Sequence, residues 1–281
     1  MIKILSTGFY SSIQDAGRFG SRHLGVPVSG CMDLYSFNLA NALLNNPSDC
    51  SVIESTFIGP TIKFLSSTYI AITGAQCHLL LNSKSIPINT VIKICKGDIL
   101  QMGKIIHGCR NYLSIIDGFD CERILDSQSQ YNRLTSFSIL QKNQIIAINQ
   151  TNRVIKNRTT IKFNQNIFTH KNLIAFKGPE FYLLTDELKH KVFSINFNIT
   201  SQSNRMAYLF KHGISHGIND IITSSVQPGT VQLTPSGNII VLMRDAQTTG
   251  GYARILQLPE QSISQLAQLP FQKKIKFCLD D

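Results

Sequence analysis

The segment Asp245–Arg254 carries the densest group of side chains that could bind a small polar molecule. It follows the apolar run Ile239–Met243, whose composition is typical of a buried strand. Gly250 and Gly251 allow positive φ angles and a close approach of a ligand to the backbone. The donors and acceptors offered to an anion or an amide are Gln247, Thr248, Thr249, Tyr252 and Arg254. We predict a binding loop here, and a polar hairpin turn is the alternative.

A second polar region runs from Ser12 to Asp33, ahead of the first predicted helix. A loop this long and this rich in ionisable groups is often functional. Its candidate site residues are Gln14, Asp15, Arg18, His23 and Asp33. The alternative is a structural loop that an arginine–aspartate contact holds in place.

A third segment, Ser203–Arg205, places a guanidinium beside the small polar side chains of Ser203 and Asn204. The planar fork of an arginine suits bidentate binding of a carboxylate or a phosphate. This segment predicts little alone, and it gains weight only beside the other two.

The motifs of several common enzyme classes are absent from the sequence. There is no Gly-x-x-x-x-Gly-Lys-Ser/Thr phosphate loop, no Gly-x-Gly-x-x-Gly, no Cys-x-x-Cys and no Gly-x-Ser-x-Gly. The pairs Cys77–His78 and His107–Cys109 lack the spacing of zinc ligands, so we expect no metal site.

The composition indicates a globular protein whose basic surplus could serve a nucleic acid, an acidic partner or an anionic substrate, and the distribution of the basic residues argues against nucleic acid. The 281 residues are 43% hydrophobic, which is ordinary for globular chains. Lysines and arginines (27) exceed aspartates and glutamates (17), giving a net charge of +10, but the basic residues are dispersed without interleaved aromatic residues. The apolar runs are strand-sized and the N-terminus shows no export signal, so we expect no membrane association. Seven scattered cysteines favour the reducing cytoplasm.

Strand patterns dominate the chain, so we expect a mainly β protein of the β-rich α+β class. Helical patterns cover Asp33–Leu44, with its first residue as N-cap candidate, and more weakly Pro179–His190 and Ile263–Leu269. Lys96–Asp98 and Pro235–Gly237 are typical of hairpin turns. Besides Ile239–Met243, the expected strands are Thr61–Leu65, Tyr69–Thr73, Val91–Cys95, Tyr112–Ile116, Ile145–Ile148, Leu173–Phe176, Val192–Phe197 and Thr230–Leu233.

A weak internal repeat relates two strand-rich stretches. Thr61–Ile72 aligns with Thr230–Val241 at a constant offset of 169 residues. We therefore expect two similarly folded halves. The polar, basic stretch Gln150–Asn166 is the natural junction, which places the domains at residues 1–150 and 151–281.

Taken together, these segments resemble the biotin-dependent carboxyltransferase family, also called allophanate hydrolase subunit 2. Its stand-alone bacterial members include the C-type subunit of the ATP-dependent 5-oxoprolinase. The similarity runs in order along almost the whole chain, and the loop before the first helix and the Gln-Thr-Thr-Gly-Gly-Tyr segment are its most specific parts. The matching residues are Ile13-Gln14-Asp15, Arg18, Gly20, Gly25, Gly30, Asp33, Ala40-Asn41, Gly59-Pro60, Thr73-Gly74-Ala75, Gly178-Pro179, Ser203–Met206, Val231-Gln232 and Gln247–Tyr252.

The resemblance implies two tandem cyclophilin-like β-barrel domains, a B-type subunit in a heterocomplex, and a separate A-type subunit. It also implies ATP-driven hydrolysis of 5-oxo-L-proline to L-glutamate, with ATP and Mg²⁺ used by the complex and the chain inactive alone. One alternative is a biotin-dependent carboxyltransferase acting on a urea-like amide. Another chain would then carry the biotin, because this one has no Ala-Met-Lys-Met attachment motif. A second alternative is a regulatory protein that binds a B-subunit-like kinase inhibitor.

The implied reaction assigns roles to the candidate residues. Opening a lactam requires activation of its carbonyl oxygen, for instance by phosphorylation, and depends on positioning and on countering negative charge. The catalytic candidates Arg205 and Arg254 would stabilise that charge, and Asp15 or Asp33 would orient a cation or a proton. The substrate-binding candidates are Gln14, Arg18, His23, Ser203, Asn204, Gln247, Thr248, Thr249, Gly250, Gly251 and Tyr252.

The chain departs from the family pattern in the middle. Asp126–Tyr131 and Thr135–Phe137 stand where members usually carry a Gly-Ser-x-Ser-Thr segment and a glycine-rich turn. Ala207 and Ala253 stand where the family tends to have Gly and Pro. The departure concerns the mid-chain loop, whereas both ends keep the pattern.

Overall fold

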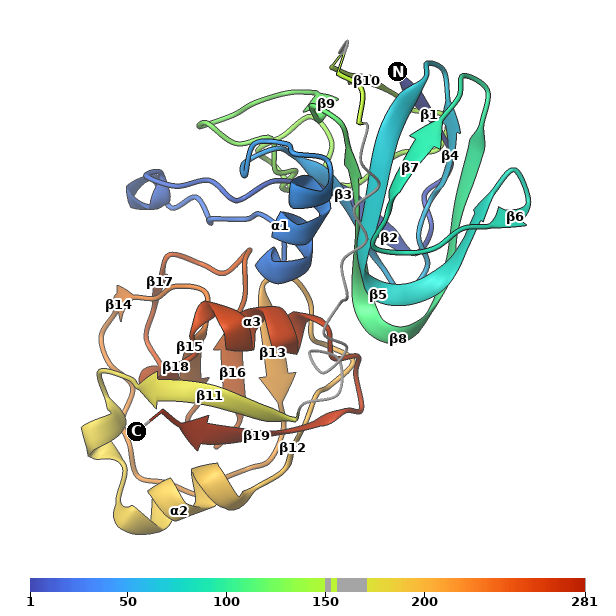
Figure 1. Ribbon diagram of the computed structural model, residues 1–281. Helices are drawn as coiled ribbons and strands as arrows, with labels where there is room; N and C mark the ends of the chain where they lie inside the picture. Colours follow the sequence, from blue (N-terminus) through green and yellow to red (C-terminus); the bar gives the residue numbers. More distant parts are fainter. Residues whose placement is uncertain (150–152, 156–170, 281) are drawn as a thin grey trace. The chain divides into compact units, whose positions relative to one another are not determined.

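A computed structural model describes residues 1–149, 153–155 and 171–280. The chain forms two compact units, and a short early segment belongs to the second one. Met1–Phe19 and Ser29–Phe168 make up unit 1, and Gly20–Val28 and Thr169–Asp281 make up unit 2. The predicted domain boundary at residues 150 and 151 and most of the predicted junction lie outside the described residues. The mainly β fold class is confirmed, because strands outnumber helices in both units (Figure 1).

Unit 1 is built on one curled sheet with β5 and β8 as its longest strands (Figure 1). The sheet order is β2-β3-β8-β4-β1-β10-β9, and β5 pairs with β6, β7 and β8. The strands are β1 (Ile2–Ser6), β2 (Tyr10–Gln14), β3 (Val52–Thr56), β4 (Thr61–Phe64), β5 (Thr68–Leu81), β6 (Lys84–Ser85), β7 (Val91–Ile94), β8 (Ile99–Ile115), β9 (Phe119–Asp120) and β10 (Ile145–Ile148).

The curl of unit 1 follows from irregular pairing and from alternating apolar residues. The β5–β8 register shifts three times between Gly74 and Leu79, and such bulges bend a strand and increase its twist. Gly74 has a φ of 90°, and a methyl group there would lie 2.6 Å from the Arg110 carbonyl oxygen, so the position requires glycine. Alternate residues such as Ile70 and Ile72 point into one core and are fully buried.

The helix α1 (Leu34–Leu43) confirms the strongest helical prediction. Asp33 is its N-cap, and the carboxylate accepts a hydrogen bond from the Ser36 backbone N–H at 3.1 Å. The buried face includes Phe37 and Ala40, which pack in a cluster with Tyr112 of β8.

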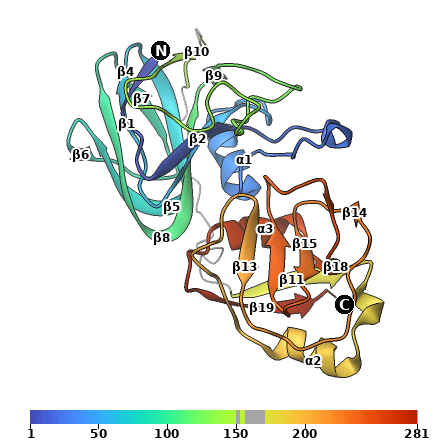
Figure 2. The same ribbon diagram turned by 180° about the vertical axis from the view of Figure 1, so that it is seen from behind.

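Unit 2 is a nearly closed barrel with helices at its periphery (Figure 2). Its sheet order is β12-β19-β11-β18-β15-β16-β13, and a bridge between Ile199 and Phe210 joins the two edges. Phe197, Phe210 and Phe277 fill the interior with ring centroids 5.5–6.4 Å apart. The strands are β11 (Asn172–Lys177), β12 (Phe197–Asn198), β13 (Ala207–Phe210), β15 (Thr230–Leu233), β16 (Ile239–Leu242), β18 (Ala253–Gln257) and β19 (Lys274–Leu279).

A short ribbon of two strands and several helical segments complete unit 2. The ribbon consists of β14 (Ser224–Ser225) and β17 (Thr249–Gly250), which pair with each other and form a sheet of their own. The helical segments are η1 (Arg22–Leu24), η3 (Phe181–Leu183), α2 (Asp186–Ser194) and α3 (Glu260–Ala267). No helix in the described part of the chain is long and apolar enough to cross a membrane.

One predicted strand is wrong, and its neighbouring helix explains why. Val192–Phe197 was expected to be extended, but α2 continues to Ser194 and only Phe197 enters a strand. Thr185 caps the helix by accepting from the Leu188 N–H, and the first turn carries two acidic residues. This local capping overrides the strand pattern, because the β-branched run by itself does not show where the preceding helix ends.

The internal repeat aligns strands with strands, but the two pairs are connected differently. The Pro235–Gly237 turn joins β15 and β16 as an antiparallel hairpin, as predicted. The corresponding strands β4 and β5 do not pair with each other in the described unit 1; β4 lies between β1 and β8. The repeat thus predicts strand positions and not strand partners.

Candidate functional site

The predicted binding loop Gln247–Tyr252 lies in unit 2. Residues 224–226, which precede it in the sequence, hold it by backbone hydrogen bonds. β17 pairs with β14 so that Thr249 faces Ser225. The Val226 N–H donates to the Thr248 carbonyl oxygen at 3.1 Å. The loop is therefore not the hairpin turn of the alternative prediction, because its partner strand is the distant pair Ser224–Ser225.

Arg254 lies beside this loop on β18 and forms a bidentate ion pair with Glu180. Its Nε donates to Glu180 Oε2 at 2.8 Å, and its Nη2 donates to Oε1 at 2.7 Å. Its Nη1 donates to the Ser225 carbonyl oxygen at 2.8 Å, so one side chain joins the pair to β14. These hydrogen bonds lower the pKa of Glu180 and raise that of Arg254.

Glu180 and Gln232 are polar residues of this region that the sequence analysis did not assign to the site. Glu180 is 9% exposed and follows Gly178-Pro179, a pair quoted only as part of the resemblance. Gln232 lies in β15 and is 1% exposed, and its cross-strand neighbour on β18 is Arg254. The sequence signal for Gln232 is its position in an otherwise apolar strand pattern. All four residues of β15 are buried, and a buried polar side chain usually has a hydrogen-bond partner.

Arg205 also forms an ion pair rather than standing alone. Its Nε donates to Asp245 Oδ2 at 2.8 Å, and both side chains are largely buried. Ser203 and Asn204 serve local backbone geometry: the Ser203 hydroxyl accepts from the Leu209 N–H, and Asn204 Oδ1 accepts from the Met206 N–H. The structure gives these three residues packing roles, and their part in substrate binding or catalysis stays a prediction.

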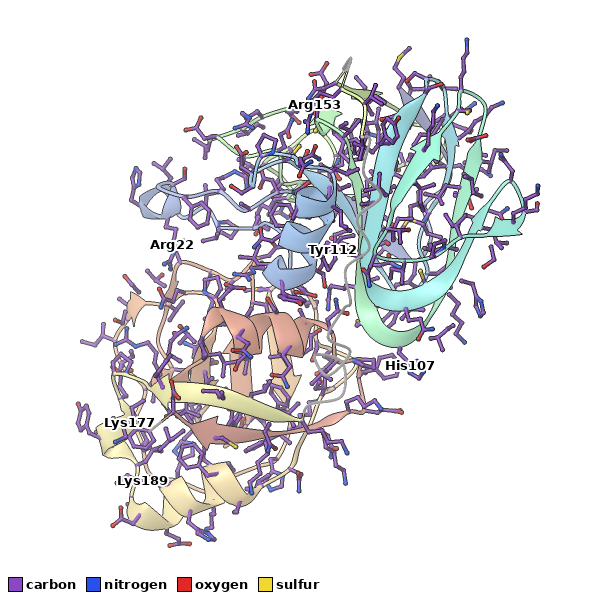
Figure 3. The ribbon with its side chains drawn as sticks, viewed as in Figure 1. Arg22, His107, Tyr112, Arg153, Lys177 and Lys189 are labelled. Atoms are coloured by element: carbon purple, nitrogen blue, oxygen red, sulfur yellow. The ribbon has the colours of Figure 1, made fainter. Side chains whose placement is uncertain are left out.

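The segment with His23 belongs to unit 2, although the sequence places it near the start of the chain. Arg22, next to it on η1, donates from Nη2 to the Thr248 carbonyl oxygen at 3.3 Å (Figure 3). This contact brings the early segment to the predicted binding loop. His23 itself is exposed.

The other four candidates, Gln14, Asp15, Arg18 and Asp33, lie in unit 1, where they are buried. The Asp15 carboxylate accepts four hydrogen bonds of 2.6–2.9 Å. The donors are the backbone N–H groups of Gly17 and Gln128 and the hydroxyls of Ser127 and Ser129.

Arg18 and Gln14 bind the same mid-chain segment. Arg18 is fully buried and donates to the carbonyl oxygens of Ile124 and Ser129 at 2.9 and 2.8 Å. Gln14 Nε2 donates to the Gln130 carbonyl oxygen at 3.1 Å. These bonds favour the structural-loop alternative: residues 14–18 hold the stretch 124–130, which departs from the family pattern.

Asp33 lies in a second buried polar cluster of unit 1 as the N-cap of α1. Its backbone N–H donates to the Tyr112 hydroxyl at 2.9 Å (Figure 3). Glu54 is close by and accepts from the Met32 N–H at 2.7 Å. Burial, followed by the charges of Glu54 and Asp33, raises the pKa of Tyr112, so this hydroxyl stays protonated at neutral pH.

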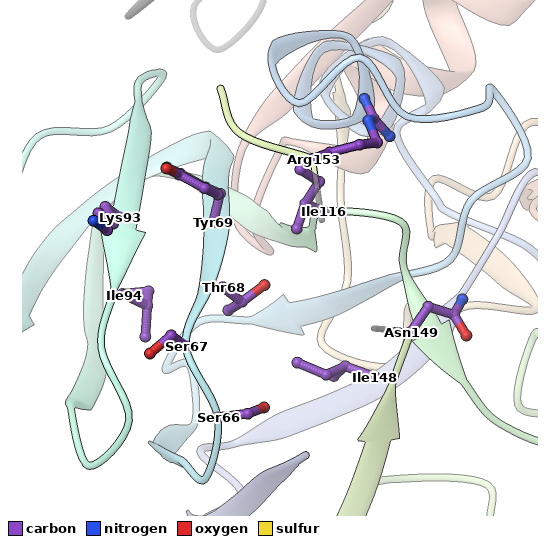
Figure 4. A pocket seen from close by; sticks show the side chains of 10 residues that line it. All are labelled: Ser66, Ser67, Thr68, Tyr69, Lys93, Ile94, Ile116, Ile148, Asn149 and Arg153. Carbon is purple, nitrogen blue, oxygen red and sulfur yellow. The ribbon is translucent and has the colours of Figure 1, made fainter. Parts of the chain in front are cut away.

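A surface hollow outlined by the described residues lies elsewhere in unit 1. It has a volume of about 200 Å³, and Lys93, Asn149 and Arg153 are among its lining residues (Figure 4). Arg153 turns away to bind the Leu44 and Asn45 carbonyl oxygens. No predicted site residue lines this hollow, so the candidate site is the group of residues around the loop of unit 2.

Comparison with known proteins agrees with the resemblance along the whole chain. The chain is 29% identical to the C-type subunit of 5-oxoprolinase from Escherichia coli over 283 aligned residues, covering 99% of this chain and 90% of that protein. The corresponding protein of Haemophilus influenzae is 28% identical over similar coverage. Urea amidolyase of Saccharomyces cerevisiae is 42% identical over 131 residues, which are 46% of this chain and 7% of the enzyme.

Solved structures share the fold along the whole chain. The protein TTHA0988 superposes with a TM-score of 0.89 at 23% identity, and this chain spans 56% of its length. The urea amidolyase of K. lactis gives a TM-score of 0.86 at 26% identity over 100% of this chain and 19% of the enzyme. Residues 24–279 match the family described as carboxyltransferase domain, subdomain A and B. The chain therefore belongs to the family of carboxyltransferase domains, subdomain A and B.

Proposed function

We propose that this chain is the C-type subunit of an ATP-dependent 5-oxoprolinase, which opens 5-oxo-L-proline to L-glutamate together with A- and B-type subunits. The observation that carries the proposal is the similarity to the C-type subunit of the Escherichia coli 5-oxoprolinase along 99% of this chain and 90% of that protein. We place the complex in the cytoplasm, in line with the scattered free cysteines.

The loop of unit 2 suits this substrate. Lactam opening builds negative charge on the carbonyl oxygen, and the substrate carries a carboxylate. Backbone and hydroxyl groups of Thr248 and Thr249, beside Arg254, provide donors for such groups. Arg254 is already neutralised by Glu180, so the pair orients its neighbours without adding net charge to the site.

ATP and Mg²⁺ belong to the complex in this proposal. The described residues contain no group of three or more His, Cys, Asp or Glu side chains that could hold a metal ion. We assign neither ligand to particular residues of this chain, and we expect the chain alone to be inactive.

An omission experiment tests the proposal. Glutamate release from 5-oxo-L-proline with ATP and Mg²⁺ is measured for this chain purified with its own A- and B-type partners, and then without this chain. We expect turnover only in the complete mixture. Equal turnover without this chain contradicts the proposal.

The second candidate is a biotin-dependent carboxyltransferase acting on a urea-like amide. It is favoured by the local identity of 42% to a segment of urea amidolyase and by the shared fold. A complete mixture that is silent with 5-oxo-L-proline but carboxylates urea in the presence of carboxybiotin would support it. A stable complex without either activity would favour the regulatory alternative.

A further inference from the structure

Arg22 is the one arginine of unit 2 that forms no ion pair with a carboxylate of the described residues. The other arginines of the unit each have a carboxylate partner: Arg205 pairs with Asp245, Arg244 with Glu260, and Arg254 with Glu180. Such an arginine has to break its pair before it can bind an anion, and a buried pair is costly to break. The charge of Arg22 is therefore the one available to an anionic ligand at this loop.

A tight turn holds the backbone around Arg22. The Leu24 N–H donates to the Ser21 carbonyl oxygen at 3.1 Å, and the Gly25 N–H donates to the Arg22 carbonyl oxygen at 3.0 Å. At the end of the side chain, Nη2 donates to the Thr248 carbonyl oxygen at 3.3 Å (Figure 3). A guanidinium carries several N–H donors in a planar fork, so this single contact leaves donors for both oxygens of a carboxylate.

The loop next to this contact carries hydroxyl groups that are also unused. The side chains of Thr248, Thr249 and Tyr252 form no hydrogen bond within the part of the chain that the structure describes. Thr249 and Tyr252 are exposed, and Arg22 and Thr248 are half-buried. A ligand can therefore reach these donors from the solvent, and no strand has to move to admit it.

We propose that Arg22 binds the carboxylate of 5-oxo-L-proline, with the loop hydroxyls as neighbouring donors. This inference rests on the proposed function and deepens it, because it names the residue that recognises the anionic group of the substrate. The sequence analysis did not select Arg22. The arginines that it did select, Arg18, Arg205 and Arg254, all bind other groups of the protein.

A carboxylate fits this site better than the phosphates of ATP do. Its single negative charge matches one guanidinium, whereas a triphosphate requires several cationic groups or a cradle of backbone N–H groups. The segments 20–28 and 247–252 together contain one Lys or Arg, which is Arg22. The sequence also has no phosphate loop.

Substitutions of Arg22 in the assembled complex provide the first test. We expect Arg22→Gln to raise KM for 5-oxo-L-proline about 10- to 100-fold, because a charge-assisted contact is lost, and to leave KM for ATP unchanged. Arg22→Lys keeps the charge without the planar fork and should give an intermediate KM. An unchanged KM for 5-oxo-L-proline in Arg22→Gln, or a rise in KM for ATP instead, would overturn the proposal.

Lys211→Gln is the matched control, because it also removes one positive charge from an exposed position of unit 2. Phe210, next to it, pairs with Ile239 at the start of β16, whereas the binding loop follows the end of that strand. We expect this variant to keep the KM of the wild-type complex. A rise equal to that in Arg22→Gln would mean that general charge, and not the Arg22 contact, attracts the substrate.

An analogue without the carboxylate distinguishes binding from a merely structural role. In 5-oxo-L-prolinamide a neutral carboxamide replaces the carboxylate, and its inhibition constant is measured by competition with 5-oxo-L-proline. We expect the wild-type complex to bind the amide about 10- to 100-fold more weakly than the acid, and Arg22→Gln to bind the two about equally. If Arg22 only held the loop in place, the variant would lose affinity for both and the ratio would stay the same, which would overturn the proposal.

A binding measurement without ATP separates this inference from the proposed function. Equilibrium dialysis of labelled 5-oxo-L-proline against the purified complex gives its dissociation constant for the wild type and for Arg22→Gln. Binding that the substitution weakens, in a complex that shows no turnover when ATP is added, would refute the proposed reaction and keep the carboxylate site. Turnover with equal dissociation constants would refute the carboxylate site and keep the reaction. A complex that neither binds nor turns over 5-oxo-L-proline would refute both.

Discussion

At the scale of single residues, most of the charged side chains predicted to form the site bind other groups of the protein. The sequence shows Gln14, Asp15 and Arg18 as a dense polar group. It does not show which groups these side chains bind. Most of their hydrogen-bond partners lie more than 100 positions later, in residues 124–130. Such long-range pairing depends on the sheet topology, which a single sequence does not reveal.

Asp15 provides a direct test of whether this group is structural. In Asp15→Asn an amide NH₂ replaces one oxygen that accepts from backbone or hydroxyl donors. We expect the free energy of unfolding to fall by about 2–3 kcal/mol, because buried donors lose their acceptor. Urea denaturation of the purified chain measures it. Asp120→Asn, at an exposed position, serves as control and changes stability by less than about 0.5 kcal/mol.

The opposite outcome for Asp15 is equally informative. Unchanged stability combined with lost turnover of the complex would show that the carboxylate acts in catalysis, as the sequence analysis predicted.

Glu180 gives a prediction for pH dependence. Its pKa is lowered in the folded protein, chiefly by the hydrogen bonds from Arg254, while the unfolded chain has the ordinary value of about 4.3. The stabilisation is complete above that value and is lost as the pH falls through the lower folded-state pKa. We expect Glu180→Gln to lower the free energy of unfolding by about 2 kcal/mol at pH 7.

The difference between the wild-type chain and Glu180→Gln should then narrow below about pH 4. Urea midpoints from pH 3 to pH 7 measure this difference. A constant difference across the whole range would contradict the assigned ion pair.

At the scale of elements, helix α1 and the β15–β16 hairpin were predictable because their signals are local. An N-cap aspartate with periodic apolar residues defines the first, and a Pro-Ser-Gly turn between two apolar runs defines the second. The segment predicted to be a binding loop follows β16, as expected, and its binding role stays a prediction. Its pairing with β14 was not predictable, because a two-residue strand such as Ser224–Ser225 has no periodicity.

Gly178 tests how tightly β11 approaches β18. A methyl group at Gly178 would lie 2.2 Å from the Arg254 carbonyl oxygen, a backbone atom that cannot move aside cheaply. We expect Gly178→Ala to destabilise the chain by about 1–3 kcal/mol and to disturb the Glu180–Arg254 pair. Gly217→Ala is the matched control, since a methyl group there meets nothing within 4 Å. Equal Tm values for the two variants would show that the backbone around Gly178 shifts without cost, which contradicts the tight approach to Arg254.

At the scale of the whole molecule, the composition and the repeat predicted a two-part β protein, and the comparisons confirm the family. What the composition could not provide is the assignment of segments to units. The polarity of Gly20–Val28 is that of any surface loop, and only the fold shows that it joins residues of the C-terminal half.

The thiol groups across the molecule give the last prediction. Burial is the main cause that raises the pKa of Cys50 and Cys77 to about 11 and that of Cys121 to about 12. At pH 8 little thiolate forms, so Cys50 and Cys77 should react about 200-fold and Cys121 about 2,000-fold more slowly than an ordinary cysteine. Cys95 is exposed, so we expect one fast phase with an aromatic disulfide reagent.

Cys95→Ser should remove that fast phase, and guanidinium should release all seven thiols. A fast phase that persists in Cys95→Ser would show that the buried thiols open readily.

The segment Gly20–Val28 also sets an order of events during synthesis. The ribosome delivers it about 140 residues before the rest of unit 2 begins, which at about 5–20 residues per second leaves it waiting roughly 7–28 s. Arg22 meets the Thr248 carbonyl only after almost the whole chain has emerged. Unit 2 is therefore completed last, from one segment near the start of the chain and one at its end. A gene split in the middle would yield a C-terminal fragment that needs the N-terminal fragment to supply its missing piece.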